Sequence, residues 1–226
     1  MELERVDTKR AYERIREQIT TLDLAPGSVI NDQQLARNLD VGLAPVREAL
    51  KLLAHENLVV ITPRYGLYVA DVNVPDLEQL SEMRLALEGL SARLAAQRAT
   101  DDDGAVLEAL RQEQASTPAE DSRRLFDLDH KFHQAVAQAA HNKYLAASLE
   151  LLFGLSQRLW YLALPNLEFL PSSVEKHLEL VEAIKTGDGD RAERIMREHV
   201  REFYAQVRTI LQSTPEAEVD RGSAEV

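Results

Sequence analysis

The stretch from Asn31 to Leu53 constrains the fold of this chain more than any other, because it reads as two short helices separated by a tight turn. Asn31 or Asp32 can cap the first helix, since their side-chain oxygens accept hydrogen bonds from the free N–H groups at a helix start. The second helix is expected to start near Ala44, with Pro45 in its first turn, where a missing N–H costs nothing.

Apolar residues of both helices recur at helical spacing and predict two inward faces: Leu35, Ala36 and Leu39 in the first helix, and Val46, Ala49, Leu50 and Leu53 in the second. Arg47 and Lys51 lie on the other side of the second helix, free to face a partner. A helix-turn-helix presents its reading helix to the major groove of DNA in this way. The alternative is that two small helices simply pack within a larger bundle.

The flanking sequence favours a winged helix-turn-helix. Upstream, apolar positions from Ala11 to Leu22 predict a further amphipathic helix that is stopped by Pro26-Gly27, after a polar lead at residues 1–7. Downstream, two β-prone runs, 59–61 and 67–69, enclose a turn-forming segment at 63–66, which is typical of a hairpin. Arg64 and Tyr65 at its tip suit a phosphate or the minor groove.

Residues 24–72 carry a resemblance to the DNA-binding domain of the GntR family of bacterial transcription regulators. Its most specific parts are the Pro26-Gly27 turn, Leu35-Ala36, the run from Pro45 to Leu50, and Gly66. The resemblance implies that Arg47 contacts the operator and that residues 1–71 form the DNA-binding domain. The residues expected at double-stranded DNA are Gln33, Arg37, Arg47, Lys51, Arg64 and Tyr65. The family usually has a hydroxyl residue, arginine and threonine before the proline, whereas Gly42-Leu43-Ala44 stand here.

The net charge of −12 is unevenly distributed. Residues 1–70 carry 9 basic and 10 acidic side chains, a net charge of −1. Residues 71–226 carry 17 basic and 28 acidic side chains, a net charge of −11. DNA affinity must therefore rest on a local basic patch, and it should fall steeply with salt because such contacts release counterions. No apolar run could span a bilayer and the charged N-terminus is no signal peptide, so the expectation is a cytoplasmic protein without a membrane partner. Zero cysteines exclude disulfides and thiolate metal sites.

From residue 75 onward the pattern predicts helices alone, at about 75–98, 102–115, 119–140, 143–163, 172–186 and 189–212. The fold class is therefore mainly α: a winged helix-turn-helix followed by an all-helical domain over residues 75–213. The polar, acidic residues 214–226 are expected to form a disordered tail.

Four ionisable residues occupy positions where the helical pattern calls for apolar ones: Asp129, His133, His177 and His199. Asp129 and His133 stand four residues apart, on one face of a helix. Val174, Leu178, Val181 and Ile184 are expected to share the face of His177. Buried carboxylates and imidazoles need partners, and a divalent metal ion would serve all four. Three imidazoles and a carboxylate suit Zn²⁺ or Ni²⁺. The alternative is that each histidine makes its own hydrogen bond in the core.

This region also resembles the all-helical FCD ligand-binding domain found in the FadR-like branch of the same family. The matching pieces are 84–88, 129–133, 142–145, 175–177, 187–188 and 196–199. The resemblance implies metal binding by the same four residues and places Arg84 and Asn142 near a bound effector. The alternatives are a salt bridge from Arg84 to Glu88 and a helix cap by Asn142. Three other histidines, His55, His130 and His141, are expected at the surface.

An ion held by one carboxylate leaves a positively charged site, which should attract a small organic-acid effector. The sequence therefore predicts a transcription repressor that binds a pseudo-palindromic operator as a homodimer and responds to a carboxylate at its metal site. Two alternatives stay open. One is a metal-dependent, hydrolase-like enzyme, in which the ion activates water. The other is a DNA-binding protein whose metal is purely structural.

Overall fold

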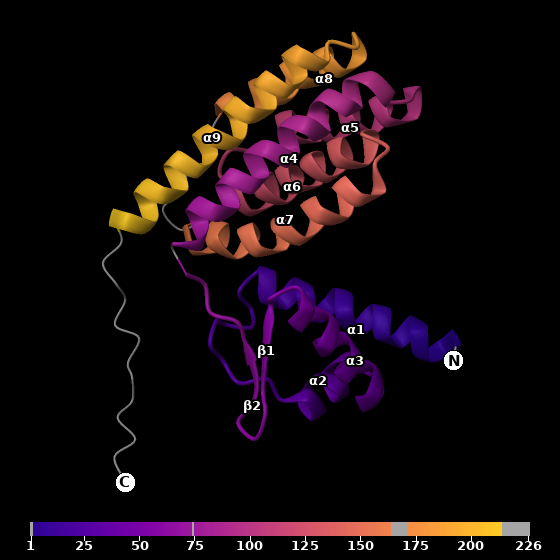
Figure 1. The fold of residues 1–226 in the computed structure, drawn as a ribbon, viewed down its shortest axis with the longest axis vertical. Coiled ribbons are helices and arrows are strands. Elements are labelled where there is room, and N and C mark those ends of the chain that lie inside the picture. Colours follow the sequence, from indigo (N-terminus) through magenta and orange to yellow (C-terminus); the bar gives the residue numbers. More distant parts are fainter. Residues whose placement is uncertain (1, 74, 164–170, 214–226) are drawn as a thin grey trace.

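The computed structural model describes residues 2–73, 75–163 and 171–213, and in them the chain forms a small winged part and a larger helical bundle (Figure 1). The winged part consists of α1 (Glu2–Thr20), α2 (Asp32–Leu39), α3 (Leu43–His55), β1 (Val59–Thr62) and β2 (Gly66–Val69). The two strands pair antiparallel, with Val59 opposite Val69 and Thr62 opposite Gly66. The predicted winged helix-turn-helix is confirmed.

Local capping sets the turn between α2 and α3. The Asn31 side chain accepts a hydrogen bond from the Gln34 N–H at 2.9 Å and so caps α2. Asp40 follows α2 in the left-handed conformation, with φ of 53°, which stops the helix and turns the chain. α3 then starts at Leu43, one residue earlier than expected, and Pro45 is buried in its first turn.

The winged part has a core of its own, built from one face of each helix and from the hairpin. Ile15 and Ile19 of α1 pack against the α3 residues Val46, Leu50 and Leu53, and all five are at most 1% exposed. α1 begins at Glu2 rather than near Ala11, so the expected polar lead at residues 1–7 is wrong. The charged residues before Ala11 continue the helix, which hydrophobic periodicity alone does not reveal.

The bundle contains six helices in the described residues: α4 (Asp76–Arg98), α5 (Asp101–Ser116), α6 (Ser122–Ala139), α7 (Lys143–Ala163), α8 (Pro171–Lys185) and α9 (Gly189–Ser213). They match the expected helices to within three residues at each end. The long helices α4 and α9 pack along each other, and Gly89 permits this approach, because a Cβ there would lie 2.8 Å from Arg197 Cγ. The expected tail at 214–226 lies outside the described residues. None of the described helices combines the length and the apolar character needed to cross a membrane.

α7 is the bundle helix that faces the winged part (Figure 1). Arg16 of α1 reaches Glu150 of α7, with Nη2 at 2.9 Å from Oε1 and at 3.0 Å from the main-chain carbonyl. Leu155 of α7 packs against the core of the winged part. Arg158 donates a hydrogen bond to the Ala70 carbonyl at 2.7 Å. One helix therefore holds the two parts together.

One side chain of α8 departs from the expected pattern. Leu178 was expected on the inward face with His177, but 42% of it is exposed, whereas Leu180 is 1% exposed. The helix is rotated so that His177, Leu180, Val181 and Ile184 face the core. Leu178 lies next to His177 in sequence, so it is turned about 100° away from it around the helix.

The two leucines of α8 give a matched test of this packing. We expect Leu180→Ala to lower the free energy of unfolding by about 2–5 kcal/mol, because it leaves a cavity in the core. Leu178→Ala should change it by about 0.5 kcal/mol or less, because its side chain is largely in water. The midpoint of urea unfolding, followed by helical circular dichroism, measures both. Equal shifts for the two variants would contradict the observed orientation of α8.

Candidate metal centre and DNA-reading surface

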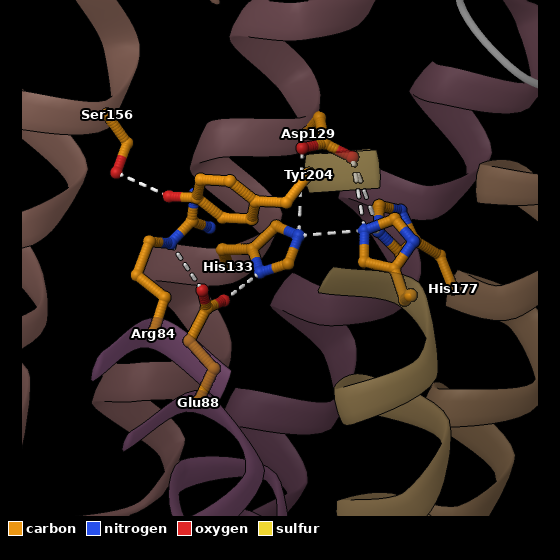
Figure 2. A network of polar contacts seen from close by, with 8 residues as sticks. Arg84, Glu88, Asp129, His133, Ser156, His177 and Tyr204 are labelled. Carbon is orange, nitrogen blue, oxygen red and sulfur yellow. Dashed lines mark hydrogen bonds and ion pairs between the residues drawn. The ribbon is translucent and has the colours of Figure 1, made fainter. Parts of the chain in front are cut away.

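Asp129, His133 and His177, which Figure 2 labels, come together with His199 in the middle of the bundle. All four are buried, with exposures of 5%, 3%, 0% and 5%. One ligand atom from each lies within 4.8 Å of those of the other three. α6 supplies Asp129 and His133, α8 supplies His177 and α9 supplies His199. The structure therefore gathers the four residues that the sequence singled out into a cluster that could hold a metal ion.

The Nε2 atoms of the three imidazoles converge on one region. His199 Nε2 lies 3.0 Å from His133 Nε2 and 3.3 Å from His177 Nε2. Asp129 Oδ1 lies 3.4 Å from His177 Nε2 and 3.7 Å from His199 Nε2. Three ring nitrogens and a carboxylate that face one another in a buried space form a donor set typical of zinc or nickel.

Outer partners fix two of these rings. The Nδ1 atom of His133 contacts the Glu88 carboxylate, and His177 Nδ1 lies 2.6 Å from Gln114 Oε1. Because Glu88 and the Gln114 carbonyl oxygen can only accept, each Nδ1 carries the proton and each Nε2 turns its free lone pair toward the cluster when the ring is neutral. Sequence reasoning missed Gln114, whose neighbours are polar and show no apolar period. It offered Glu88 only as a salt-bridge partner of Arg84.

Burial and neighbouring charges set the protonation of these groups. Burial holds the pKa of His177 and His199 well below the usual value, and the neighbouring imidazoles lower it further. Burial alone would lower the pKa of His133 too, but Glu88 and Asp129 outweigh it and raise that pKa. Burial raises the pKa of Asp129. A metal ion would therefore meet two neutral imidazoles and displace a proton from His133, so its affinity should fall with decreasing pH.

Arg84 lies beside the cluster and points inward, as its position on the helix predicted. Its Nε lies 2.6 Å from Glu88 Oε1, so the predicted pairing four residues along the helix is present, and both side chains are 2% exposed. Burial would raise the pKa of Glu88, but Arg84 and His133 outweigh it and lower that pKa to about 2. The guanidinium of Arg84 also lies over three aromatic rings. Its Cζ is 4.8 Å from the ring centroid of Trp160, 4.9 Å from that of Phe153 and 5.5 Å from that of Tyr204.

A chain of hydrogen bonds continues from Arg84 to α7. Arg84 Nη1 lies 3.4 Å from the Tyr204 hydroxyl, which in turn lies 2.7 Å from the Ser156 hydroxyl (Figure 2). Glu88 links the same arginine to His133. The metal cluster, Arg84 and α7 thus form one connected buried network.

The second residue expected near an effector, Asn142, caps α7. Its side-chain oxygen accepts hydrogen bonds from the Tyr144 and Leu145 N–H groups at 3.2 and 3.3 Å. This is the capping role that the sequence offered as the alternative. Contact with an effector stays a prediction for Asn142.

Of the three histidines expected at the surface, two are exposed. His55 and His141 face solvent, and His141 Nε2 lies 2.8 Å from Asp103 Oδ2. The expectation is wrong for His130, whose ring packs edge-on against Phe153 with the centroids 5.3 Å apart. Burial lowers the pKa of His130 to about 3, and the nearby positive charge of Arg84 adds to this effect. His130 is half-buried because α7 packs against this side of α6, where Phe153 lies.

The residues expected at DNA are all exposed on the winged part: Gln33, Arg37, Arg47, Lys51, Arg64 and Tyr65. Arg47 Nε is held at 2.7 Å from Asp32 Oδ2, so α2 orients the guanidinium on the outer face of α3. Lys51 pairs with Glu48 at 2.7 Å. Leu43, where the resembled family has arginine, is partly buried and packs against the core of the winged part.

Comparisons with known proteins agree with both parts. Residues 7–69 match the family described as "Bacterial regulatory proteins, gntR family", and residues 79–202 match the FCD domain. The HTH-type transcriptional repressor RspR of Escherichia coli is 29% identical over 205 residues, 90% of each chain. The Nta operon transcriptional regulator of Aminobacter aminovorans is 28% identical, covering 82% of this chain and 87% of the relative.

Solved structures share the fold. E. coli McbR/YncC superposes with a TM-score of 0.78 at 22% identity and covers 90% of this chain and 97% of its own. A putative GntR transcriptional regulator from Rhodococcus sp. RHA1 superposes with a TM-score of 0.72 at 20% identity, and the match covers 92% of this chain and 98% of that chain. The structure has a winged part joined to a helical bundle that buries an aspartate and three histidines. Together with the family matches, this shows that the chain is a GntR-family transcription regulator with an FCD domain.

Proposed function

We propose that this transcription regulator is a repressor whose operator affinity is controlled by a small carboxylate bound at a divalent metal site in the helical bundle. The convergence of Asp129, His133, His177 and His199 within 4.8 Å carries the proposal. The relatives RspR and GlaR, both from E. coli, bear the name repressor, which supports the direction of control.

The donor chemistry of the cluster fits a zinc or nickel ion. Without a cation, and with the rings neutral, the lone pairs of His133 Nε2 and His177 Nε2 would both face His199 Nε2, whose single N–H could serve only one of them. Glu88 and Gln114 already orient two of the rings from outside, which is the role that outer partners have in metal sites. We therefore propose that Asp129 and the three histidines hold the ion.

The charges around the cluster favour an anionic effector. A bound divalent ion would supply two positive charges and coordination positions for oxygen ligands. Asp129 and Glu88 each bring one negative charge, and Arg84 brings one positive charge, which leaves the region positive when the histidines are neutral. A small organic acid is the class of ligand that such a region attracts. Arg84 already donates to Glu88 through Nε, so a bound carboxylate would have to share this guanidinium.

At the other end of the molecule, the exposed side of α3 and the wing would contact DNA. A homodimer would place the winged parts of its two subunits on the two half-sites of a pseudo-palindromic operator. The network from Arg84 through Tyr204 and Ser156 reaches α7, which touches the head. Effector binding changes DNA affinity only if the effector binds more tightly to one arrangement of the heads. We place this activity in the cytoplasm, where the operator is.

The two alternatives from the sequence differ in support. The matched relatives are transcription regulators, which speaks against a metal-dependent hydrolase and accounts for the winged part. A purely structural metal is distinguished from an effector site by experiment, as set out below.

Metal content tests the cluster directly. The purified wild-type protein, reconstituted with Zn²⁺ or Ni²⁺ and desalted, should contain about one ion per chain by elemental mass spectrometry. The His177→Ala, His199→Ala double variant should lose it. The His55→Ala, His141→Ala double variant removes two exposed histidines and is the matched control, which should keep its ion. A wild-type chain that resists reconstitution would exclude the metal site.

A thermal-shift screen of small organic acids, with and without added Zn²⁺ or Ni²⁺, tests the effector. An acid at 100 times its dissociation constant should stabilise the protein by about 2.7 kcal/mol, which is a shift of several degrees. The shift should need the ion, because the acid coordinates it. If the ion raises the melting temperature but no acid adds to it, the metal is structural.

Operator binding tests the reading helix. Arg47→Ala should weaken binding about 10-fold or more, because one good side-chain contact to a base is worth about 1–3 kcal/mol. Arg208→Ala removes an exposed arginine from α9 and should leave the affinity within about two-fold. A gel-shift titration at fixed salt measures both. Unchanged binding by Arg47→Ala would show that α3 does not read DNA.

A further inference from the structure

Arg158, on α7, is a buried arginine for which the described part of the chain provides no ion-pairing carboxylate. It is 5% exposed, and its Nη1 donates to the Ala70 carbonyl at 2.7 Å. Its Nε has no hydrogen-bond partner, and the described residues form no ion pair with it. Arginine is almost never fully buried unless it is paired, because removing its charge from water is costly. Burial lowers the pKa of this group, although Asp76 and Asp71 oppose that effect.

The same arginine lines a pocket of about 590 Å³ between the two parts of the molecule. The pocket lies between β1 and the segment 70–73 on one side and α4 and α7 on the other. Its size falls within the range of about 300–1,000 Å³ that is usual for small-molecule sites. The metal cluster does not line it, so the pocket is distinct from the site described above.

The rest of the lining shows what would fit there. Apolar side chains make up about half of the lining, among them Val60, Leu80, Met83, Leu155 and Leu159, and the amides of Asn57, Asn73 and Gln79 also line it. Val60 is 46% exposed and Met83 is 51% exposed, so apolar surface of both parts is left in water in a pocket that a buried arginine also lines. Asp71 and Asp76 line the pocket as well; they are exposed, so water weakens their effect on a ligand without removing it. Their negative charge therefore favours a ligand with one carboxylate over a ligand with two.

We propose that this pocket binds a small monocarboxylate with an apolar body. Its carboxylate pairs with the guanidinium of Arg158, which lines the pocket, and neutralises that charge. Its apolar body covers Leu80, Met83 and Val60. Neither the metal nor the effector proposed above is needed for this binding, so the two proposals can fail separately.

Such a ligand would touch both parts of the molecule at once. Val60 belongs to the wing, Met83 to α4 and Arg158 to α7. Occupancy would therefore favour the arrangement in which the wing lies against the bundle. The site would give the regulator a second input that acts on the placement of the reading head directly.

Calorimetric titration of the full-length protein tests the proposal with hexanoate as the probe. Hexanamide has nearly the same shape without the charge, and adipate adds a second carboxylate. We expect hexanoate to bind about 10-fold more tightly than hexanamide, because hydrogen bonds to charged groups are the stronger ones. It should also bind about 10-fold more tightly than adipate, because Asp71 and Asp76 disfavour a second carboxylate. No detectable hexanoate binding would mean that Arg158 is only a tether to Ala70, and the proposal would be wrong.

Variants locate the bound hexanoate. Arg158→Gln removes the charge and keeps an amide that can donate to Ala70, and it should weaken hexanoate binding about 10-fold. Met83→Trp places a bulky ring in the pocket and should also weaken it. Leu90→Trp enlarges another exposed residue of α4, which does not line the pocket, and is the matched control. The His177→Ala, His199→Ala double variant should bind hexanoate as the wild type does.

Two results would overturn the assignment: binding that survives both Arg158→Gln and Met83→Trp, or binding that is lost in the double histidine variant. Helical circular dichroism and thermal melting check the folding of each variant. If Arg158→Gln does not fold, Met83→Trp against Leu90→Trp decides, because both are substitutions at exposed positions.

Discussion

The buried ion pair between Arg84 and Glu88 is the contact on which the organisation of the bundle depends. Two charges that are 2% exposed are costly to bury, and only close pairing with further hydrogen bonds offsets that cost. Here Glu88 also contacts His133, and Arg84 also meets the Tyr204 hydroxyl and three aromatic rings. The pair thereby connects α4 with α6, α7 and α9. The contact of Glu88 with His133 Nδ1 also orients that imidazole within the cluster of Asp129 and the three histidines.

α7 gives the molecule its second organising constraint, because it is shared between two environments. Phe153 and Ser156 face the network around Arg84, whereas Glu150, Leu155 and Arg158 contact the winged part. The two sets alternate along little more than two turns of one helix. A movement of α7 that changes its contacts with the network around Arg84 must therefore also change its contacts with the winged part. This is the physical condition for communication between the bundle and the winged part.

Much of this arrangement follows from sequence patterns. Capping residues and apolar spacing predicted α2, α3, the hairpin and the described helices of the bundle, and polar residues on inward faces pointed to the four side chains that the structure gathers in one cluster. What the sequence did not reveal depended on distant neighbours. Gln114 became a partner of His177 only through the packing of α5 against α8. His130 is half-buried against α7, and Leu178 is turned outward by the rotation of α8. The pocket at Arg158 exists only because two parts with separate cores meet.

The close approach of Arg16 to Gly154 has a consequence for chimeras that combine the winged part of one such regulator with the bundle of another. A Cβ at residue 154 would lie 2.7 Å from Arg16 Nη2, so the end of the arginine side chain would have to move if the glycine were replaced. That end of the side chain makes the ion pair and the hydrogen bond to Glu150. A winged part without the arginine would leave Glu150 without that partner. Chimeras that keep the arginine and the glycine together should therefore keep this contact between the two parts.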